Sequence, residues 1–333
     1  MKITLQDIAE DTGYSVSTVS RVLNGSDKIS SKAREEILES AKRFRYLTPK
    51  ARNAHTSTKV LNIALVASGF HEGEFYVSFF HGLNKAAARN NIRLFLAGVL
   101  DPHEGFIELM KEITFSYYDG AILFIPEFTR LDYEEVGQAI PAKFPVISNA
   151  LIENPVFSTI TFDSYTGGHL VATHFEERGY RRLGVIKGSV ERAESRFRYN
   201  GFTDYVLRKP DLDLVWNYSG DFTFESGYEA FKKFEASPDK PRAIFACNDD
   251  MCNGFMEAAI KKGYSFPDDI AIIGYDDLPV CRHNKPTMSS VKTDYEQLGM
   301  ETMKRMREKL SNPDLKTGML SFVPVSIVQR ESS

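Results

Sequence analysis

The chain has 333 residues, of which 42% are hydrophobic and 26% are charged, a composition typical of a globular protein. This length predicts two or three domains. No apolar run of about 18 residues and no apolar N-terminal signal stretch are present, so we expect neither a membrane span nor secretion. The cysteines, at 247, 252 and 281, form no CxxC pair and no disulfide framework, so we expect a cytoplasmic protein with reduced thiols.

Charge is distributed unevenly along the chain. The net charge is −4, yet residues 1–59 contain 11 Lys and Arg against 7 Asp and Glu, and the remainder contains 30 basic and 38 acidic residues. A basic segment joined to an acidic body can approach a phosphate backbone with one end only. The charge pattern therefore favours a nucleic-acid contact at the N-terminus.

The first 24 residues predict two short helices joined by a tight turn. Thr4 is a good N-cap, and Asp7 places a carboxylate in the first turn, where the helix dipole favours it. Gly13 can end this helix in a left-handed conformation, and Ser15 can cap a second helix from Val16 to Leu23. Two helices joined by so short a turn are typical of a helix-turn-helix, whose second helix enters the DNA major groove.

The second helix carries side chains that suit DNA contacts. Short hydroxyls can bond to bases or phosphates, and an arginine can form two hydrogen bonds with a guanine. A small amphipathic helix inside a larger core explains the same pattern, because short helix-turn-helix patterns produce false matches. The residues favoured by this pattern are Ser15, Ser17, Thr18, Ser20 and Arg21.

A third helix is expected from about Ser31 to Phe44, capped by Ser30, and it completes a small three-helix head. Such a head is marginally stable alone. The following segment, 46–59, is polar and basic and has no apolar periodicity. It is either a flexible linker or a hinge that orders against the minor groove when DNA binds.

From Val60 onward, apolar runs alternate with amphipathic segments. This alternation indicates parallel sheets that are buried on both faces. At least nine strands exceed one Rossmann-like unit, so we predict two α/β lobes. The predicted strands are 60–68, 92–100, 119–126, 144–150, 158–162, 181–188, 214–220, 243–248 and 270–276, and the predicted helices are 75–90, 166–178, 198–207, 226–234, 251–262 and 295–310.

Paired α/β lobes bind small ligands in the cleft between them, at the carboxyl ends of the strands. Polar side chains follow many of the predicted strands and suit a ligand rich in hydroxyls, and an aromatic such as Phe222 can lie against a sugar or base. Phe75 is expected to begin a helix packed on its sheet, with the cleft mouth as the alternative place. The strand-end candidates are Ser68, Asn149, Asp163, the turn 192–201, Asp221, Phe222, Asn248, Asp249, Asp250, Asp276, Asp277 and Thr293.

Several segments resemble the lactose/galactose-repressor family of bacterial transcription regulators. The N-terminal TLQDIAEDTGYSVSTVSRVLNG is similar to the family's DNA-binding signature, and matching body segments are SRFRYNGF, IFACNDDMCNGFMEAAIKKGYSFPDDIAIIGYDD, MSSVKTDYEQLG and FVPVSIVQR. The resemblance covers nearly the whole chain. It implies an α/β fold class, with an N-terminal three-helix helix-turn-helix head and a two-lobed, periplasmic-binding-protein-like body of parallel sheets.

The resemblance also implies where the domains lie. Residues 1–48 would be the DNA-binding domain, 49–59 the hinge or linker, and 60–331 the effector-binding and dimerisation domain. Within the last, the N-terminal lobe would comprise about 60–162 and 292–321, and the C-terminal lobe about 163–291 and 322–331.

Residue roles follow from the same resemblance. Arg198 matches the arginine that contacts the effector, because its spacing to Gly201 favours it over Arg196. Asn248 and Asp276 match the amide and carboxylate that form hydrogen bonds with sugar hydroxyls. Val16 and Ser17 match positions that read operator bases, Arg21 a supporting contact, and Phe222 an aromatic wall of the pocket. The DNA-binding candidates are Thr4, Ser15, Val16, Ser17, Thr18, Ser20, Arg21, Asn24, Ala54 and His55, and the effector-binding candidates are Ser68, Phe75, Asn149, Asp163, Arg198, Phe222, Asn248, Asp276 and Thr293.

Two departures from the family pattern limit what can be transferred. The family hinge usually presents PNxxARxL, whose leucine wedges into a central base step and kinks the duplex. This chain has TPKARNAHTS, with Ala54 or His55 in place of that leucine. Asn149 and Thr293 stand where some sugar-binding members carry aspartate and glutamine, so the effector of those members does not transfer.

We therefore expect a cytoplasmic, homodimeric transcription regulator, a repressor of carbohydrate-use genes, that binds pseudo-palindromic operator DNA and a sugar-type effector. The alternative within this class is an effector that is a purine or a protein coregulator. A solute-binding protein is opposed by the basic head. An enzyme is opposed because the adjacent pairs Asp249-Asp250 and Asp276-Asp277 rarely aim both carboxylates at one point. No cofactor, metal or membrane partner is expected.

Overall fold

The computed structural model describes residues 4–23, 29–44, 60–68 and 75–333. It divides into two compact units, Met1–Val60 and Leu61–Ser333, which we describe separately. The candidates Asn24, Ala54 and His55, and the whole expected hinge 49–59, lie outside the described residues.

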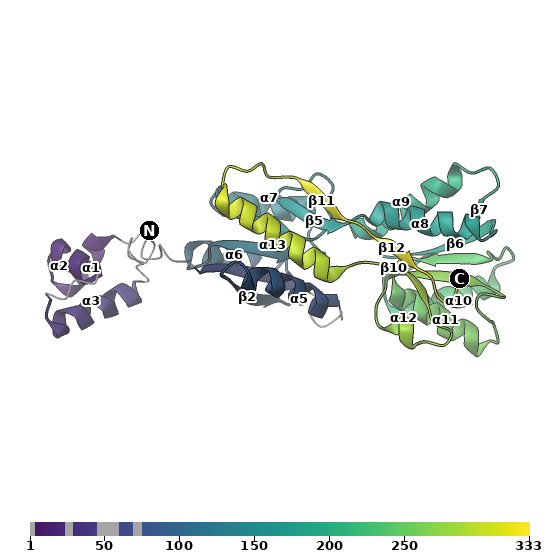
Figure 1. Cartoon of the computed structure of the whole chain (residues 1–333), viewed down its shortest axis with the longest axis horizontal. Helices are drawn as coiled ribbons and strands as arrows, with labels where there is room; N and C mark the ends of the chain where they lie inside the picture. Colours follow the sequence, from purple (N-terminus) through teal and green to yellow (C-terminus); the bar gives the residue numbers. More distant parts are fainter. Residues whose placement is uncertain (1–3, 24–28, 45–59, 69–74) are drawn as a thin grey trace. The chain divides into compact units, whose positions relative to one another are not determined.

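The first unit contains the three expected helices, α1 (Leu5–Thr12), α2 (Val16–Leu23) and α3 (Ser31–Arg43) (Figure 1). Thr4 and Asp7 form a capping box, in which the Thr4 N–H donates to the Asp7 carboxylate at 2.6 Å and the Thr4 hydroxyl accepts from the Asp7 N–H at 3.4 Å. Gly13 ends α1 with φ at 71°, which a residue without a Cβ adopts at low cost. The Ser15 hydroxyl accepts from the Thr18 N–H at 3.2 Å, as expected of an N-cap.

A small apolar core joins these helices. Side chains from all three elements are buried in it, and the Ser40 hydroxyl of α3 donates to the Asp11 carboxylate of α1 at 2.5 Å. Each helix therefore depends on the other two for burial of its apolar face. The buried residues of this cluster are Ile8, Ala9, Val19, Val22, Ile37 and Ala41.

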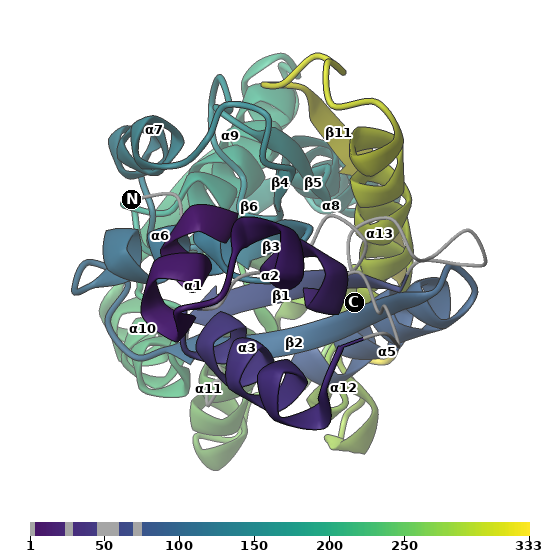
Figure 2. The ribbon, with the colours of Figure 1, turned by 90° about the vertical axis from the view of Figure 1, so that its left-hand side faces the viewer.

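The second unit contains two sheets, each belonging to one lobe. The N-terminal lobe has a parallel sheet in the order β11-β5-β4-β3-β1-β2. Apolar residues of β1 alternate between its faces, so α5 and α13 pack on one face while α6 and α7 pack on the other (Figure 2). Its elements are β1 (Leu61–Ser68), α5 (Phe75–Ala88), β2 (Ile92–Val99), α6 (Phe106–Phe115), β3 (Gly120–Phe124), α7 (Arg130–Ala139), β4 (Val146–Ser148), β5 (Ser158–Phe162), α13 (Tyr295–Ser311) and β11 (Leu320–Val323).

The C-terminal lobe has the sheet order β12-β10-β9-β8-β6-β7, parallel except for the antiparallel strand β12. One continuous apolar cluster fills it, and its central strands are buried throughout. Its elements are α8 (Ser164–Glu177), β6 (Arg182–Lys187), α9 (Ala193–Leu207), β7 (Asp213–Ser219), α10 (Phe224–Ala236), β8 (Ala243–Ala246), α11 (Asp249–Lys261), β9 (Ala271–Asp276), α12 (Val280–His283), β10 (Ser289–Lys292) and β12 (Ser326–Val328).

Three details differ from the sequence-based expectations. The segment 192–201 is mostly not a turn, because α9 begins at Ala193 rather than at 198. Helices α6, α7 and α12 and strands β10, β11 and β12 were not predicted. Phe322 and Val323 belong to β11 of the N-terminal lobe, whereas the expected boundary placed them in the C-terminal lobe. In the described part of the chain, no helix has both the length and the apolar character that crossing a bilayer requires.

Helices α8 and α9 pack at unusually close range through two glycines. A Cβ added at Gly201 would lie 1.9 Å from the carbonyl oxygen of Tyr165, and one added at Gly168 would lie 2.0 Å from the carbonyl oxygen of Arg198. Only hydrogen fits at either position. This contact fixes the backbone of α9 at Arg198, the residue expected to reach the ligand.

Candidate ligand-binding site

A cavity of about 490 Å³ lies between the two lobes of the second unit. Five of the nine effector-binding candidates line it, namely Phe75, Arg198, Phe222, Asn248 and Asp276. Loops that follow the strands of both lobes supply half of its lining residues, and helices and strand ends supply the rest. The other lining residues are Tyr76, Phe124, Pro126, Glu127, Arg192, Glu194, Asp221, Thr223, Asp250, Leu278 and Tyr295.

Arg198 and Asp276 form a nearly buried ion pair at the cavity. The two guanidinium nitrogens lie 3.4 and 3.2 Å from the carboxylate oxygens, and Nη1 also donates to the Cys247 carbonyl at 2.6 Å. The guanidinium carbon lies 3.8 Å from the centroid of the Tyr275 ring. Burial raises the pKa of Asp276 to about 6, although the positive charge of Arg198 opposes the rise.

The Arg198 Nε–H is buried and has no hydrogen-bond partner among the described residues. A buried donor of this kind carries the full cost of desolvation. A polar ligand that reached this atom would recover that cost. The side chain is therefore held in place by Asp276, Cys247 and Tyr275, and its Nε–H remains as a buried donor for a ligand.

Asn248 and Phe222 of the same lobe also line the cavity and are bonded to each other. Asn248 caps α11 by accepting from the Met251 N–H at 3.0 Å, and its amide nitrogen donates to the Phe222 carbonyl at 2.8 Å. Because an amide has two donor hydrogens and two acceptor lone pairs, one of each remains for a ligand. Phe222 has φ at 75°, and its ring occupies the space beside Gly188, where a Cβ would lie 2.1 Å from the ring.

An aromatic cluster from the N-terminal lobe forms another part of the wall. The rings of Phe75 and Tyr295 stack with centroids 4.7 Å apart, and Phe124 lies 5.9 Å from Phe75. The Tyr76 hydroxyl donates to the Ser68 carbonyl at 2.5 Å. These rings offer a flat apolar surface opposite the polar groups of the other lobe.

The cavity is lined by more carboxylates than cations. Five carboxylates face two arginines, and each arginine already has an acidic partner, because Arg198 is paired with Asp276 and Arg192 lies 3.6 Å from Glu127. Asp221 accepts from the N–H and hydroxyl of Thr223 at 3.0 and 2.6 Å, and these hydrogen bonds lower its pKa. The arrangement suits a ligand that donates hydrogen bonds and disfavours an anion.

The N-terminal end of α9 bridges the two lobes. The Glu194 carboxylate of the C-terminal lobe accepts from the Leu151 N–H of the N-terminal lobe at 2.9 Å. Arg192 pairs with Glu127 at 3.6 Å, and Arg196 pairs with Glu153 at 3.6 Å. We call these three contacts the α9 bridge. They connect the lobes directly beside the cavity.

Four of the predicted effector-binding residues are not among those lining the cavity. Asn149 is buried, and its amide donates to the Ile160 carbonyl and the Thr302 hydroxyl at 2.9 and 2.7 Å. Asp163 caps α8 by accepting from the Thr166 N–H at 3.0 Å. The Ser68 hydroxyl donates to Glu127. Thr293 lines a neighbouring cavity of about 310 Å³, and its hydroxyl donates to the Asp276 carbonyl at 3.1 Å.

Several lining residues were not singled out from the sequence, although some carried a signal. Glu127 directly follows the predicted strand 119–126, so the rule of polar residues at strand ends applies to it. Arg192 and Glu194 fall in the segment 192–201, which was singled out only as a whole. Tyr76, Phe124 and Tyr295 had no local signal that distinguishes a cavity wall from a core.

In the first unit, α2 presents the expected face to solvent. Ser15, Val16, Ser17 and Arg21 are exposed, whereas Val19 and Val22 are buried in the three-helix core. Val16 is 40% exposed despite being apolar, so its side chain is available for contact with a partner surface. Thr18 and Ser20 are half-buried, and Thr4 is engaged in the α1 cap.

Family models match both units. Residues 4–48 match the model described as bacterial regulatory proteins, lacI family, and residues 172–333 match a periplasmic binding protein-like domain. The chain combines a lacI-family DNA-binding domain with a periplasmic-binding-protein-like body. It is a DNA-binding regulator and not an enzyme.

Relatives of known name and structure span the same length. The chain is 24% identical to the HTH-type transcriptional repressor PurR of Mannheimia succiniciproducens, covering 98% of each, and 27% identical to the probable repressor ExuR of Bacillus subtilis, covering 94% and 93%. The fold matches the Lac repressor bound to ONPG with a TM-score of 0.75 at 22% identity, covering 100% of both chains. It also matches the CelR–cellobiose complex with a TM-score of 0.71 at 24% identity, covering 100% of both chains.

Proposed function

We propose that this lacI-family protein is a cytoplasmic, homodimeric repressor that binds a pseudo-palindromic operator. The observation that carries the proposal is the exposed face of α2, which holds Ser15, Val16, Ser17 and Arg21 within the segment that matches the family model. A two-fold protein presents two such helices to two half-sites, so its operator has two-fold symmetry. The relatives PurR and ExuR are named as repressors, which supports repression rather than activation.

We propose further that the effector is a neutral, hydroxyl-rich ligand such as a sugar. The carboxylates and the Asn248 amide supply acceptors for hydroxyl donors, and the Phe222 ring offers a face for an apolar sugar surface. Both arginines of the described lining already have acidic partners and carboxylates outnumber them there, so a phosphate or carboxylate on the effector would meet electrostatic repulsion. A purine base is the second candidate, because the aromatic walls also fit a planar ring.

Effector and operator are coupled if the effector binds the closed arrangement of the lobes better than the open one. The coupling free energy equals this difference in affinity. Ligand bound between Arg198 on one lobe and the aromatic wall on the other contacts both lobes at once. Such a ligand therefore favours one arrangement of the two lobes over the other. A regulatory response requires this preference.

The operator proposal is tested by selecting DNA from a random pool with the full-length protein. The enriched site is expected to be an inverted repeat, and Arg21→Ala should weaken binding to it roughly 10-fold or more, since a bidentate arginine–guanine contact is worth about 1–3 kcal/mol. Lys111→Ala removes the same charge from an exposed position of the second unit and should bind as the parent does. No enrichment, or an Arg21→Ala variant with parental affinity, would refute the assignment of α2.

The effector proposal is tested by a thermal-shift panel of neutral mono- and disaccharides, their phosphates and uronates, and purines. A compound at 100 times its dissociation constant adds about 2.7 kcal/mol, roughly 5–10 °C for a body of this size. A neutral sugar is expected to raise the melting temperature, and its phosphate is expected to raise it far less. A hit among the phosphates alone would contradict the charge argument, and a purine hit would favour the second candidate.

A further inference from the structure

The turn that carries Asp276 has an unusual backbone. Asp276 has φ at 112° and Asp277 has φ at 55°, so two consecutive residues with side chains adopt positive φ. This region is unfavourable for residues with a Cβ and persists only where surrounding contacts hold it. The Asp276 carboxylate faces Arg198 because of this turn. The contacts that hold the turn therefore also determine the position of a cavity carboxylate.

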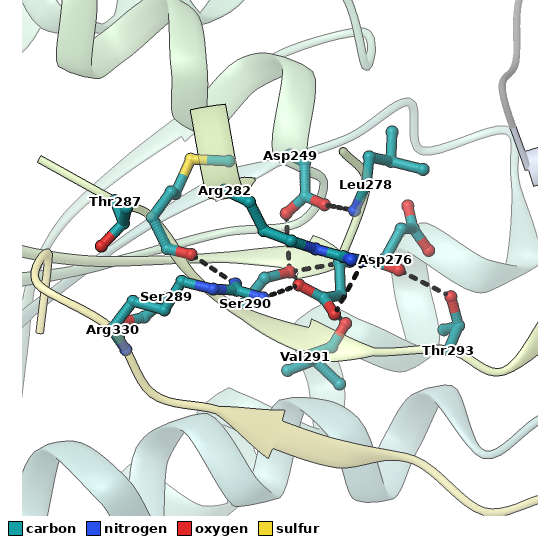
Figure 3. A network of polar contacts seen from close by, with 12 residues as sticks. Asp249, Asp276, Leu278, Arg282, Thr287, Ser289, Ser290, Val291, Thr293 and Arg330 are labelled. Carbon is teal, nitrogen blue, oxygen red and sulfur yellow. Dashed lines mark hydrogen bonds and ion pairs between the residues drawn. The ribbon is translucent and has the colours of Figure 1, made fainter. Parts of the chain in front are cut away.

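On one side, the turn is held by a buried carboxylate and a serine (Figure 3). The Leu278 N–H donates to Asp249 Oδ2 at 2.7 Å, and the Asp277 N–H donates to Ser290 Oγ at 3.0 Å. The Ser290 hydroxyl donates in turn to Asp249 Oδ1 at 2.6 Å. These contacts fix the backbone after Asp276, but they leave the Asp277 side chain to another partner.

That partner is Arg330, which follows strand β12 near the end of the chain (Figure 3). Its Nη2 donates to Asp277 Oδ1 at 2.6 Å and its Nη1 donates to the Met288 carbonyl at 2.7 Å. The Arg330 N–H donates to the Ser289 hydroxyl at 2.8 Å. The Arg330 and Asp277 side chains are only 14% and 6% exposed, so solvent screens this ion pair weakly.

We propose that Arg330 is a positioning residue for effector recognition, which acts through Asp277 to hold the Asp276 carboxylate at the cavity. The proposal rests on the proposed effector function of that cavity. Arg330 is not among the residues that line the cavity, so its influence on a ligand is indirect. One nitrogen of the Arg330 guanidinium bonds to Asp277 and the other bonds to the Met288 carbonyl, just before β10. The single ammonium of a lysine cannot form both bonds in the same geometry.

Arg282 does not duplicate this role. Its Nη2 lies 3.9 Å from Asp277 Oδ2, and its side chain is 62% exposed. An exposed pair at that separation is screened by water and constrains the side chain weakly. The turn therefore depends on Arg330 for its rigid connection to β10.

The test compares Arg330→Lys with Arg242→Lys in the full-length protein. Arg242 serves as the matched control, because its guanidinium donates to the carbonyls of Asp269 and Asp268 at 2.7 Å each and is exposed in the same lobe. Both variants keep the positive charge and lose a guanidinium that forms hydrogen bonds through two of its nitrogens. Amide hydrogen exchange over residues 276–280 is the first readout, since the Leu278 and Asp277 amides are bonded in the parent.

Arg330→Lys is expected to speed exchange over 276–280 at least tenfold, whereas Arg242→Lys leaves that segment at the parental rate. The panel sugar that raises the parent's melting temperature most should bind Arg330→Lys about tenfold more weakly and Arg242→Lys equally well. Parental exchange in Arg330→Lys would overturn the proposal, as would equal acceleration in both variants. If exchange is faster in Arg330→Lys but no compound of the panel binds the parent, the turn does depend on Arg330. The proposed effector function of the cavity would then be refuted instead.

Discussion

Arg198→Ala is expected to abolish the effector response while operator binding remains intact. The substitution removes the cation opposite Asp276, a carboxylate whose side chain is 14% exposed, and the donor to the Cys247 carbonyl. Hydrogen bonds to charged groups are each worth about 1.5–3 kcal/mol, so loss of the guanidinium should weaken effector binding roughly 100-fold. We propose that α2 contacts the operator, and α2 belongs to the other unit, which the substitution does not touch.

Isothermal titration with the effector and a fluorescence assay with operator DNA measure the two effects separately. Because an unpaired buried charge also destabilises the lobe by about 3–5 kcal/mol, the measurement is made below the variant's melting temperature. Arg208→Ala is the control, since it removes the same charge from an exposed position at the far end of α9. If Arg198→Ala bound the effector as tightly as the parent does, the assignment of Arg198 as an effector-binding residue would be wrong.

Gly201→Ala is expected to have the largest effect on stability. The added Cβ would lie 1.9 Å from the Tyr165 carbonyl oxygen, which is a backbone atom and cannot rotate away. Helices α8 and α9 would have to separate, and we expect a loss of about 3 kcal/mol or more in the free energy of unfolding. Urea unfolding followed by circular dichroism measures this, with the transition checked for two-state behaviour because the lobes are linked.

Gly137→Ala provides the matched control. In α7 the nearest atom to an added Cβ is the Val156 Cγ1 at 3.5 Å, an ordinary van der Waals distance. Alanine is favoured over glycine inside a helix by about 1 kcal/mol, so this variant should be as stable as the parent or slightly more stable. Equal stability of the Gly201→Ala and Gly137→Ala variants would refute the close-packing argument.

The sequence alone predicted those helices and strands that are determined by residues close together in the chain. The nine predicted strands are all present in the described residues, because each is a short run rich in apolar, aromatic or β-branched residues. Strands β10, β11 and β12 were not predicted, and β12 pairs with β10 across the intervening α13, a partner that its own residues do not indicate. Helix α7 did carry a signal that was not used, the capping box of Thr129 and Asp132. Long-range pairing limited the prediction of strands, whereas the capping box of α7 was visible in the sequence.

Apart from Phe75, which begins α5, the candidate site was predictable where a residue follows a strand or matches the family. Phe222, Asn248 and Asp276 meet both conditions and line the cavity, as does Arg198 by resemblance. Asn149 and Asp163 also follow strands, but their side chains bond to a neighbouring strand and to a helix start instead. Position in the chain gives the end of a strand. It does not give the direction of the side chain, which depends on partners distant in sequence.

The α9 bridge makes ionic strength a variable in effector binding. Two of its three contacts are ion pairs with partly exposed side chains, and salt weakens such pairs within a Debye length of about 8 Å at physiological concentration. Because the bridge joins the two lobes beside the cavity, we expect it to influence the fraction of molecules whose lobes are arranged for binding. The apparent dissociation constant is the intrinsic one divided by that fraction. The same effector concentration would thus give a weaker response in a cell under osmotic stress than in one at low salt.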